Sequence, residues 1–519
     1  MVKVNCALIS ASNKDGIVEF AKGLSELGVK IISSGGTAEL LSKNKVPVVE
    51  ISKVTGFPEM MDGRVKTLHP KIHGGILADR SKKSHLEQAK KQGIELIDLV
   101  IVNLYPFEQT IRKGVSIEEA IENIDIGGPT LVRSAAKNFK SVGVVCDSAN
   151  YGIILKELKE NKCSLSEQTR KDLALDAFSH VAHYDAVIEL YLRKAFGKTD
   201  YPHYLNLTFE KSQDMRYGEN PHQSASFYFE FDRQAPSVSS SKCLQGRELS
   251  YNNILDINSA FELVKEFKDP TVVIVKHNNP CGVASDPDLI SAYKKALAVD
   301  TDAAFGGVIS INKKMDEKLA ALIIERFYEV VVAPGFTDKA KEIFTKKSKL
   351  RLIEMGEFKT PKTAPQKTYR SVVGGLLVQD LDNELLDESK LRAVTKRKPT
   401  DQEMKDLIYA WTICKHVKSN SIVYARNNQA VGIGAGQMKR IDAAKLAAMI
   451  AESYGETVKG CAMASDAFFP FRDGVDAAAK VGVTCVIQPG GSIKDPEVIN
   501  AANEHNLAMV FTGMRHFRH

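Results

Sequence analysis

The chain has 519 residues, of which 44% are apolar and 26% charged, with 70 Lys and Arg against 64 Asp and Glu. This composition excludes disordered, collagen-like and fibrous proteins, and a net charge of +6 lacks the strong basic excess of a dedicated nucleic-acid binder. At ~100–200 residues per domain, the length predicts two to four domains. No apolar run reaches the ~18 residues that span a bilayer, and the polar N-terminus is unlike a signal peptide, so we expect a cytoplasmic protein without a membrane segment.

The first 200 residues alternate short apolar runs with segments of helical periodicity. Apolar residues recur at helical spacing from Ile17 to Leu27, and buried strands are predicted at Val4–Ile9, Val29–Ile32, Leu96–Val102 and Val142–Cys146. Strands that alternate with helices form parallel sheets, which bind ligands at the carboxyl ends of their strands. We therefore expect the loops after three of these strands to line one pocket: Ser10–Lys14, Ser34–Thr37 and Asn103–Pro106.

The rest of the chain resumes this alternation after a break. Leu165–Gly197 has a helical pattern, and Gly197–Pro202 is a candidate domain boundary. Beyond it, helices are predicted at Ser259–Phe267, Leu289–Ala298, Glu317–Phe327, Asp401–Val417 and Ile441–Tyr454. Strands are predicted at Thr271–Val275, Val308–Ile311, Val330–Ala333, Ser421–Ala425, Ala430–Ile433 and Val483–Ile487. Glu357–Lys367 and Ala393–Thr400 are connectors, so two α/β units are expected, without a short-period repeat.

A glycine pair between a predicted strand and a predicted helix is a candidate anion site. Ser34, Gly35, Gly36 and Thr37 allow close approach of the backbone, and the N–H groups of a helix N-terminus favour phosphate. A tight turn with Thr37 as the N-cap explains the same residues equally well. Hydroxyl groups and a cation that follow the neighbouring strand favour the anion site: Ser10, Ser12 and Lys14.

Other patterns exclude functions. Gly432, Gly434 and Gly436 have the spacing G-x-G-x-G rather than G-x-G-x-x-G, and a hairpin precedes them, so dinucleotide binding is not predicted. Cys281 matches half of a zinc deaminase motif, but Ala284 occupies the position of the second cysteine, so no zinc is predicted. The sequence has no Walker A pattern, and its eight cysteines form no C-x-x-C pair, which favours reduced thiols.

Titratable side chains stand at several places that suit catalysis. Lys276 and His277 directly follow a predicted strand, which is where α/β enzymes place catalytic groups. Asp125 precedes a helix that carries Lys137, so it is either a simple cap or half of an acid/base pair. Arg64–Pro70, with His73 close by, packs cations between Gly, Pro and His.

Two polar loops that carry aromatic residues complete the set of candidates. Met215–Gln223 is dense in polar and aromatic side chains. Ser465–Asp473 sets three Phe residues between acidic ones, which suits an aromatic wall for a flat heterocycle better than a plain core cluster.

Taken in order, these motifs resemble one family along essentially the whole chain. The family consists of bifunctional purine-biosynthesis enzymes that combine aminoimidazole-carboxamide ribonucleotide (AICAR) formyltransferase with inosine monophosphate (IMP) cyclohydrolase activity. The matching segments are Arg64–Pro70, Asn103–Phe107, Ile124–Gly128, Met215–Gln223, Lys276–Pro280, Gly432–Gln437 and Ser465–Asp473.

The resemblance implies an α/β fold. A methylglyoxal-synthase-like parallel-sheet domain at residues 1–199 would carry the cyclohydrolase. A formyltransferase region at residues 200–519 would follow, built from two zinc-free cytidine-deaminase-like α/β units at roughly 200–365 and 390–519 with a connector between them. The resemblance also implies a homodimer with formyltransferase sites at the subunit interface.

For the cyclohydrolase site, the resemblance implies two groups of binding residues. The nucleotide phosphate would be held by Ser12, Asn13, Lys14, Ser34, Gly35, Gly36 and Thr37. The base and ribose would be surrounded by Arg64, Val65, Lys66, Thr67, Asn103, Asp125, Ile126 and Gly127. In the cyclisation, Lys66 and Tyr105 would donate to the developing oxyanion, Lys137 would transfer the proton, and Asp125 would orient the amide.

For the formyl-transfer site, the resemblance implies His277 as general base, Lys276 as oxyanion or leaving-group partner, and Asn420 as the residue that orients the formyl group of 10-formyltetrahydrofolate. Nucleotide and folate would be bound by Arg216, Tyr217, Gly306, Glu329, Arg440, Ile441, Phe468, Asp473, Ser492, Ile493, Arg515, Phe517 and His519. Glu329 stands where some members have Asp, which changes its reach. A structural monovalent cation, such as potassium, would lie near Ser419, Ser421 and Asp466.

The resemblance thus implies AICAR, its formylated product FAICAR, IMP and folate as ligands. A first alternative is a single-activity enzyme with one inactive site, which loss of Lys137, Lys276 or His277 would favour; all three are present. A second alternative is a nucleic-acid-binding protein, but the Lys-rich stretches lack interleaved aromatic residues. We therefore expect neither nucleic acid nor membrane as a partner.

Overall fold

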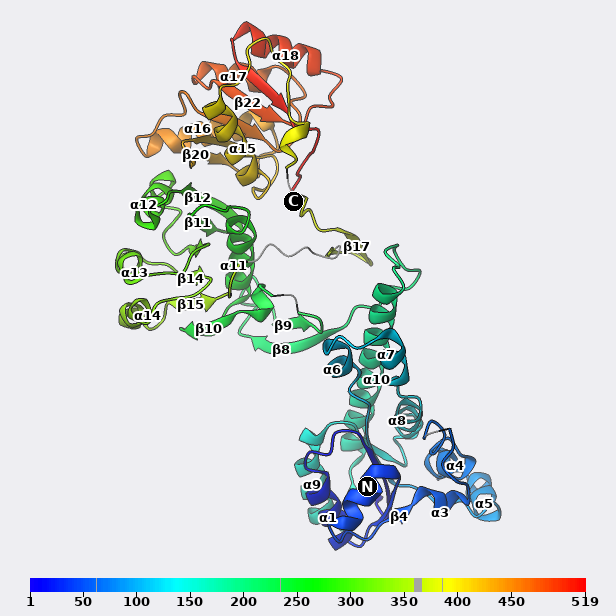
Figure 1. Cartoon of the computed structure of the whole chain (residues 1–519). Helices are drawn as coiled ribbons and strands as arrows, with labels where there is room; N and C mark the ends of the chain where they lie inside the picture. The colour runs from blue at the N-terminus through cyan, green and yellow to red at the C-terminus, as the bar shows by residue number, and fades with distance from the viewer. Residues whose placement is uncertain (62, 234, 359–365, 385) are drawn as a thin grey trace. The chain divides into compact units, whose positions relative to one another are not determined.

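The computed structural model describes residues 1–61, 63–233, 235–358, 366–384 and 386–519. The chain forms two compact units, here called unit 1 (Met1–Glu210) and unit 2 (Lys211–His519) (Figure 1). The division follows Glu210, somewhat later than the predicted boundary at residue 199. Most of the predicted connector 357–367 lies outside the described residues.

In the described part of unit 1, five parallel strands form one sheet in the order β4-β3-β2-β5-β6. They are β2 (Cys6–Ala11), β3 (Lys30–Ser33), β4 (Val49–Glu50), β5 (Leu99–Asn103) and β6 (Gly143–Val145). The predicted parallel sheet is thereby confirmed. β2, β3 and β5 end later than predicted, in Ala11, Ser33 and Asn103. Polar residues extend the ladder because their side chains find partners, as Ser33 Oγ does at Ile9 O, 2.7 Å away.

Helices surround this sheet, and a short antiparallel pair, β1 (Val2–Lys3) and β7 (Ser164–Leu165), lies apart from it. The helices are α1 (Ile17–Glu26), α2 (Gly35–Lys43), α3 (Ile51–Thr55), α4 (Pro70–Leu77), α5 (Lys83–Lys91), α6 (Phe107–Arg112), α7 (Ile117–Glu122), α8 (Gly127–Lys137), η1 (Ser148–Asn150), α9 (Tyr151–Glu160) and α10 (Glu167–Ala195). The hydroxyl of Ser166 accepts a hydrogen bond from Thr169 N at 3.1 Å and so caps α10.

Among the described residues of unit 2, twelve strands form a mixed sheet whose two halves mirror each other. Its order is β10-β15-β14-β13-β11-β12-β20-β19-β21-β22-β23-β18. The first half contains β10 (Lys242–Gln245), β11 (Thr271–Lys276), β12 (Asn279–Ser285), β13 (Val308–Ile311), β14 (Val330–Ala333) and β15 (Arg351–Glu354). The second contains β18 (Arg392–Ala393), β19 (Ile422–Arg426), β20 (Gln429–Gly434), β21 (Ala462–Ser465), β22 (Cys485–Gln488) and β23 (Ala508–Phe511).

Each half starts with an antiparallel hairpin and continues with three parallel strands, and the hairpins join antiparallel at Ala284 and Gln429. Both hairpins carry a bulge at the same place, between Ile274 and Val275 and between Tyr424 and Ala425. Corresponding residues lie 150 positions apart along the chain. The two predicted α/β units are therefore two copies of one arrangement, and the repeat is too long to be a short-period one.

Helices cover both faces of this sheet. They are α11 (Tyr251–Val264), α12 (Leu289–Val299), α13 (Glu317–Ile323), α14 (Asp338–Phe344), α15 (Asp401–Cys414), α16 (Arg440–Ser453), α17 (Asp473–Lys480) and α18 (Asp495–Glu504). Alternate residues of β11 face opposite sides: Val273 packs in the core shared by α11 and α15, whereas Ile274 packs with α12, α13 and α14. The remaining elements are η2 (Val238–Ser240), η3 (Thr345–Lys347), η4 (Glu388–Lys390), and the two-stranded pairs β8 (Phe209–Met215) with β9 (Ala225–Glu230) and β16 (Lys367–Val372) with β17 (Gly375–Asp380).

The predicted helices of unit 2 differ from the structure at one or both ends, and α11 and α13 differ most. α11 begins at Tyr251 rather than Ser259, because Ser250 and Asn253 form a reciprocal capping box ahead of it. α13 ends at Ile323 rather than Phe327, whose carbonyl instead accepts a hydrogen bond from Gly306 N at 2.8 Å.

The glycines of β20 serve packing. A Cβ on Gly434 would lie 2.0 Å from Ala443 O, and one on Gly432 would lie 2.2 Å from Ala447 O, so only glycine lets α16 approach the strand. Gly282 meets Ala296 O of α12 in the same way, at 2.0 Å. This close strand–helix contact explains why Gly432 and Gly434 stand in a spacing that is similar to a dinucleotide-binding motif.

Candidate active sites

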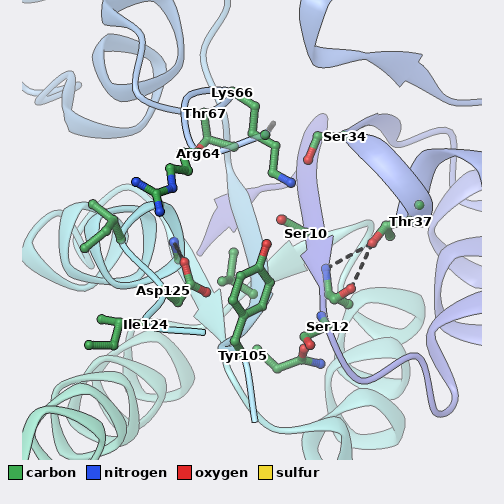
Figure 2. A pocket seen from close by; sticks show the side chains of 18 of the residues that line it. Ser10, Ser12, Ser34, Thr37, Arg64, Lys66, Thr67, Tyr105, Ile124 and Asp125 are labelled. Atoms are coloured by element: carbon green, nitrogen blue, oxygen red, sulfur yellow. Dashed lines mark hydrogen bonds between the residues drawn. The ribbon is translucent and has the colours of Figure 1, made fainter. Parts of the chain in front are cut away.

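A polar pocket of about 560 Å³ lies in unit 1 at the carboxyl ends of β2, β3 and β5 (Figure 2). The expectation that the three loops after these strands share one pocket is thereby confirmed. Of the predicted residues, the pocket is lined by Ser12, Lys14, Ser34, Gly36, Thr37, Arg64, Lys66, Thr67, Asn103, Tyr105, Asp125, Ile126 and Gly127. Asn13, Gly35 and Val65 are chain neighbours of these residues and not part of the lining itself.

One end of the pocket is the N-terminus of α2 with an ammonium group on each side. A Cβ on Gly35 would lie 3.9 Å from Lys66 Nζ, and one on Gly36 would lie 3.9 Å from Lys14 Nζ. Ser34 is the N-cap, in an extended conformation. The unpaired N–H groups of the helix and two cations make this end suited to an anion such as phosphate.

Thr37 is not at the helix N-cap, where the interpretation as a simple turn would put it. It lies inside α2, where it is buried and its hydroxyl donates to Ala11 O at 3.0 Å, so it is not the N-cap. Ala11 N donates back to Thr37 Oγ1 at 3.3 Å, and Lys14 Nζ donates to Ala11 O at 3.2 Å. These bonds tie the end of β2 to the start of α2 and hold Lys14 beside the helix terminus.

Asp125 forms the opposite wall. Its carboxylate accepts a hydrogen bond from Gly128 N at 2.8 Å, and its own N–H donates to Tyr184 Oη at 2.8 Å. A Cβ on Gly128 would lie 2.4 Å from Asp125 Oδ2, so a glycine at position 128 is needed for this contact. Burial raises the pKa of Asp125, while the N–H groups around it and the Lys66 ammonium act in the opposite direction.

Lys66, Tyr105 and Asp125 surround the same space in Figure 2. Tyr105, 40% exposed, presents its hydroxyl from the loop after β5. Asn103 is held by the backbone: its side-chain oxygen accepts from Ser12 N and from Asn13 N, the latter at 2.9 Å. A cation, a phenol and a partly desolvated carboxylate thus line the same pocket.

The structure does not bring Lys137 to this pocket. Lys137 is the last residue of α8, whose first residue, Gly127, lines the pocket. Ten residues of helix correspond to about 15 Å along the axis, so Lys137 is not paired with Asp125 within the chain. Its proton-transfer role stays a prediction that this geometry does not support.

In unit 2, Lys276 and His277 lie at the tip of the β11–β12 hairpin. His277 and Asn278 form the turn, both with left-handed backbones (φ 51° and 63°). Lys276 Nζ donates to Phe305 O and Gly306 O, each at 3.0 Å, which leaves one of its three N–H groups for a ligand. The His277 side chain is exposed.

Asn420 belongs to a buried polar network behind this tip. Arg440 donates to Asn420 Oδ1 at 2.7 Å and forms an ion pair with the buried Asp466, which also accepts from Ser419. Asn420 Nδ2 donates to the carbonyl groups of Gln437 and Met438, at 2.8 and 3.1 Å. Since both amide hydrogens are engaged, Asn420 offers a ligand only an acceptor, and a donor role toward a formyl oxygen is not supported.

The side chains of the predicted cation site are likewise already engaged with other protein groups. Arg440 already neutralises the Asp466 carboxylate, and Ser421 Oγ faces Cys414 Sγ at 3.1 Å. Within the described residues, no group of three or more His, Cys, Asp and Glu side chains is arranged to hold a metal ion. A monovalent cation therefore remains a prediction.

The other predicted residues of unit 2 occupy several places. Arg515 lies 4.3 Å from the ring of Phe517, and both line a second cavity of about 630 Å³ with the acidic segment Asp380–Glu384. His519 packs against Phe517 at 5.5 Å. Glu329 forms an ion pair with Arg351 at 2.8 Å. The remaining ones lie in the loops after β8, β21 and β22 and at the starts of α16 and α17: Arg216, Tyr217, Phe468, Ser492, Ile493, Ile441 and Asp473.

The fold agrees with comparisons to known proteins. Residues 135–450 match the family described as "AICARFT/IMPCHase bienzyme", and residues 16–130 match the family described as "MGS-like domain". The chain belongs to the AICARFT/IMPCHase bienzyme family. The predicted resemblance and fold class are confirmed: an MGS-like parallel-sheet domain is followed by an α/β region, and the family's two named activities are a formyltransferase and a cyclohydrolase.

A solved structure titled "Crystal structure of ForH" is also similar to the chain. The two sequences are 35% identical, and the match covers 36% of this chain and 99% of that chain, with a TM-score of 0.32. In the part of the chain that the structure describes, every helix is too short or too polar to span a membrane.

Sequence reasoning missed several residues that shape the candidate sites. Tyr184, far along α10, has no motif around it, yet it fixes the backbone of Asp125. Asp256 and Ser259 of α11 contact the Asn278 turn residue. One sequence signal could have found Asp256. Asp256 lies six residues after the N-cap of its helix, and Asp406 lies six residues after the N-cap of the matching helix in the second half.

Proposed function

We propose that this chain catalyses two consecutive reactions of purine synthesis. Unit 2 transfers a formyl group from 10-formyltetrahydrofolate to the 5-amino group of AICAR, and unit 1 closes the product, FAICAR, to IMP with loss of water. The observation that carries this proposal is the unit 1 pocket, which joins an anion site at the α2 N-terminus to the group of Lys66, Tyr105 and Asp125. Family membership supports both reactions.

In the cyclisation, the carboxamide nitrogen attacks the formyl carbon. The nitrogen is a poor nucleophile, so it loses a proton as the C–N bond forms, and the formyl oxygen gains negative charge. Lys66 and Tyr105 donate hydrogen bonds to that oxygen. Asp125, whose pKa burial raises, accepts the carboxamide proton and returns it to the oxygen that leaves as water. The formamide nitrogen loses its own N–H proton as the C=N bond of IMP forms, and this proton is the second one of the water. The nucleotide phosphate lies at the α2 N-terminus, beside Lys14.

In the formyl transfer, the 5-amine is conjugated with the imidazole and is weakly basic. The exposed imidazole of His277 accepts the proton of this amine during attack, and the free N–H of Lys276 stabilises the tetrahedral oxyanion. The C–N bond to the folate then breaks, and the folate nitrogen takes up a proton. Arg515 and Phe517 offer a cation and an aromatic ring to these ligands.

A spectrophotometric assay tests both assignments. The purified protein is given AICAR and 10-formyltetrahydrofolate, and tetrahydrofolate and IMP are followed together in wild type, His277→Ala, Lys66→Ala and Lys137→Ala. We expect His277→Ala to lose folate release but to cyclise supplied FAICAR. We expect Lys66→Ala to show the reverse, with cyclisation reduced on the order of 10²-fold, and Lys137→Ala to retain most cyclisation.

The outcomes separate the hypotheses. If the wild type forms neither product at neutral pH, the proposal is wrong. If it performs one reaction only, the chain is a single-activity enzyme. A loss of cyclisation in Lys137→Ala as large as in Lys66→Ala would restore the predicted role of Lys137. The homodimer, which the resemblance implies, is checked by sedimentation of the same preparations.

A further inference from the structure

The two halves of unit 2 hold their hairpin turns in a comparable way. His277 and Asn278 in the first half correspond to Asn427 and Asn428 in the second, and all four backbones are left-handed, with φ between 51° and 63°. Such a backbone pair forms the two-residue turn that matches the twist of a hairpin, and it costs about 1–2 kcal/mol for each residue other than glycine. These turns therefore need outside contacts to hold them.

An aspartate on the helix before each hairpin supplies such a contact. Asp256 of α11 accepts a hydrogen bond from Asn278 N at 2.7 Å, and Asp406 of α15 accepts one from Asn427 N at 2.8 Å. Both aspartates lie six residues after an N-cap that forms a capping box, Ser250 and Thr400. Asp256 bonds to the second turn residue of its hairpin and Asp406 to the first turn residue of its own. An aspartate–turn contact thus belongs to both halves, whereas the His side chain occurs in the first turn alone.

The first half adds a second contact that the other half lacks. Ser259, one helical turn after Asp256 on α11, donates to Asn278 Oδ1 at 3.1 Å. Ser259 in turn accepts a hydrogen bond from Arg518 Nη2 at 3.3 Å. At the matching position of α15 stands Tyr409, whose hydroxyl contacts Ser285 instead, at 3.1 Å. The turn with His277 is therefore held through both its backbone and its side chain.

We propose that Asp256 is a positioning residue for His277 in formyl transfer, with Ser259 as its partner on α11. This proposal rests on the proposed function of unit 2. Asp256 acts through the hydrogen bond to Asn278 N, which fixes the direction in which the exposed His277 ring leaves the hairpin. A base displaced by about 1 Å loses on the order of 10²-fold in rate. Because the contact positions the base and holds no substrate, its loss should lower kcat and leave KM nearly unchanged.

The chain offers a matched control for this test. Asp256→Ala and Asp406→Ala each remove one aspartate–turn hydrogen bond of almost equal length, from hairpins with and without His277. Asp406 is 4% exposed, so Asp406→Ala should cost at least as much stability. Asp256→Asn keeps an acceptor oxygen and serves as the rescue variant, and Ser259→Ala tests the partner contact.

The measurements are kcat and KM for formyl transfer, the urea midpoint, and the cyclisation of supplied FAICAR. We expect kcat of Asp256→Ala to fall about 10- to 100-fold with KM within about threefold of wild type, and Asp256→Asn to recover most of it. Asp406→Ala should keep kcat within about threefold, and every variant should cyclise FAICAR normally.

Two results would overturn this inference while the proposed function stands. One is an equal loss of kcat in Asp256→Ala and Asp406→Ala, which would show a stability effect. The other is an Asp256→Asn variant as slow as Asp256→Ala, which would show that the hydrogen-bond acceptor is not what matters. If the wild type transfers no formyl group, or His277→Ala remains active, it is the proposed function that fails.

Discussion

Asp125 is subject to two opposing influences, and their balance sets its chemistry. Burial raises the pKa of its carboxyl group, whereas the Lys66 ammonium and nearby N–H groups favour the ionised form. A base in the cyclisation must be ionised before substrate arrives, yet basic enough to take a proton from an amide. A partly desolvated carboxylate beside a lysine meets both needs.

Removal of the Lys66 charge should therefore change the pH dependence of cyclisation. Without the ammonium, the pKa of Asp125 rises further, so the acidic limb of the profile should move to higher pH in Lys66→Ala, beyond the loss of rate. Lys66→Arg keeps the charge and should keep the limb in place. The measurement is kcat/KM for FAICAR between pH 5 and 9.

Lys71→Ala is the matched control, since Lys71 Nζ donates to Val54 O at 3.3 Å and does not line the pocket. Its profile should follow the wild type. If the acidic limb of the Lys66→Ala profile stays in place or moves to lower pH, Asp125 is not the group that titrates.

At the scale of elements, sequence patterns predict buried strands well and their partners poorly. Val308–Ile311 and Val330–Ala333 have the predicted bounds, because four apolar residues between polar turns leave little choice. The sequence predicts the hairpin β19–β20 ahead of Gly434, and the structure confirms it. The hairpin β11–β12 is not distinguishable from parallel strands by pattern alone, since both kinds of strand are fully buried here.

The candidate sites show the same limit. Tyr105, in the loop after β5, and Lys276 and His277, at the end of β11, could be predicted because the edge of a sheet gathers such residues. Lys66 lies between α3 and α4, and only the resemblance assigned it to this site. Tyr184 and Asp256 act from helices distant in sequence, and only the packing of those helices brings them to the site. The distance of Lys137 from Asp125 depends on the length of α8, which the motif itself does not show.

The contact between β20 and α16 gives an element-scale prediction. Gly434→Ala would place a Cβ 2.0 Å from Ala443 O, so strand and helix must separate. We expect unit 2 to lose about 2 kcal/mol or more of unfolding free energy, measured by urea denaturation. Gly375→Ala is the control in the same unit, because its Cβ would meet only Val372 Cγ2 at 3.5 Å, an ordinary contact. Equal midpoints for the two variants would contradict the packing role of Gly434.

At the scale of the whole molecule, the two proposed reactions have a thermodynamic reason to occur on one chain. Formyl transfer to a weakly basic amine is close to reversible, and the cyclisation removes its product and draws the sequence forward. The chain places the two proposed sites in separate compact units, each with its own sheet. A change that disables one site therefore leaves the other folded, so the two steps can be separated by point variants.

This separation predicts that two inactive variants complement each other in solution. His277→Ala cannot form FAICAR, and Lys66→Ala forms it but scarcely cyclises it, so neither alone should convert AICAR and 10-formyltetrahydrofolate to IMP at an appreciable rate. Mixed in equal amounts, they should produce IMP after a lag, because FAICAR must first accumulate and diffuse to an intact unit 1. The lag should shorten as total protein is raised, which stopped-flow absorbance would measure. Failure of the mixture, when each variant keeps its remaining single activity, would mean that FAICAR passes between sites without release.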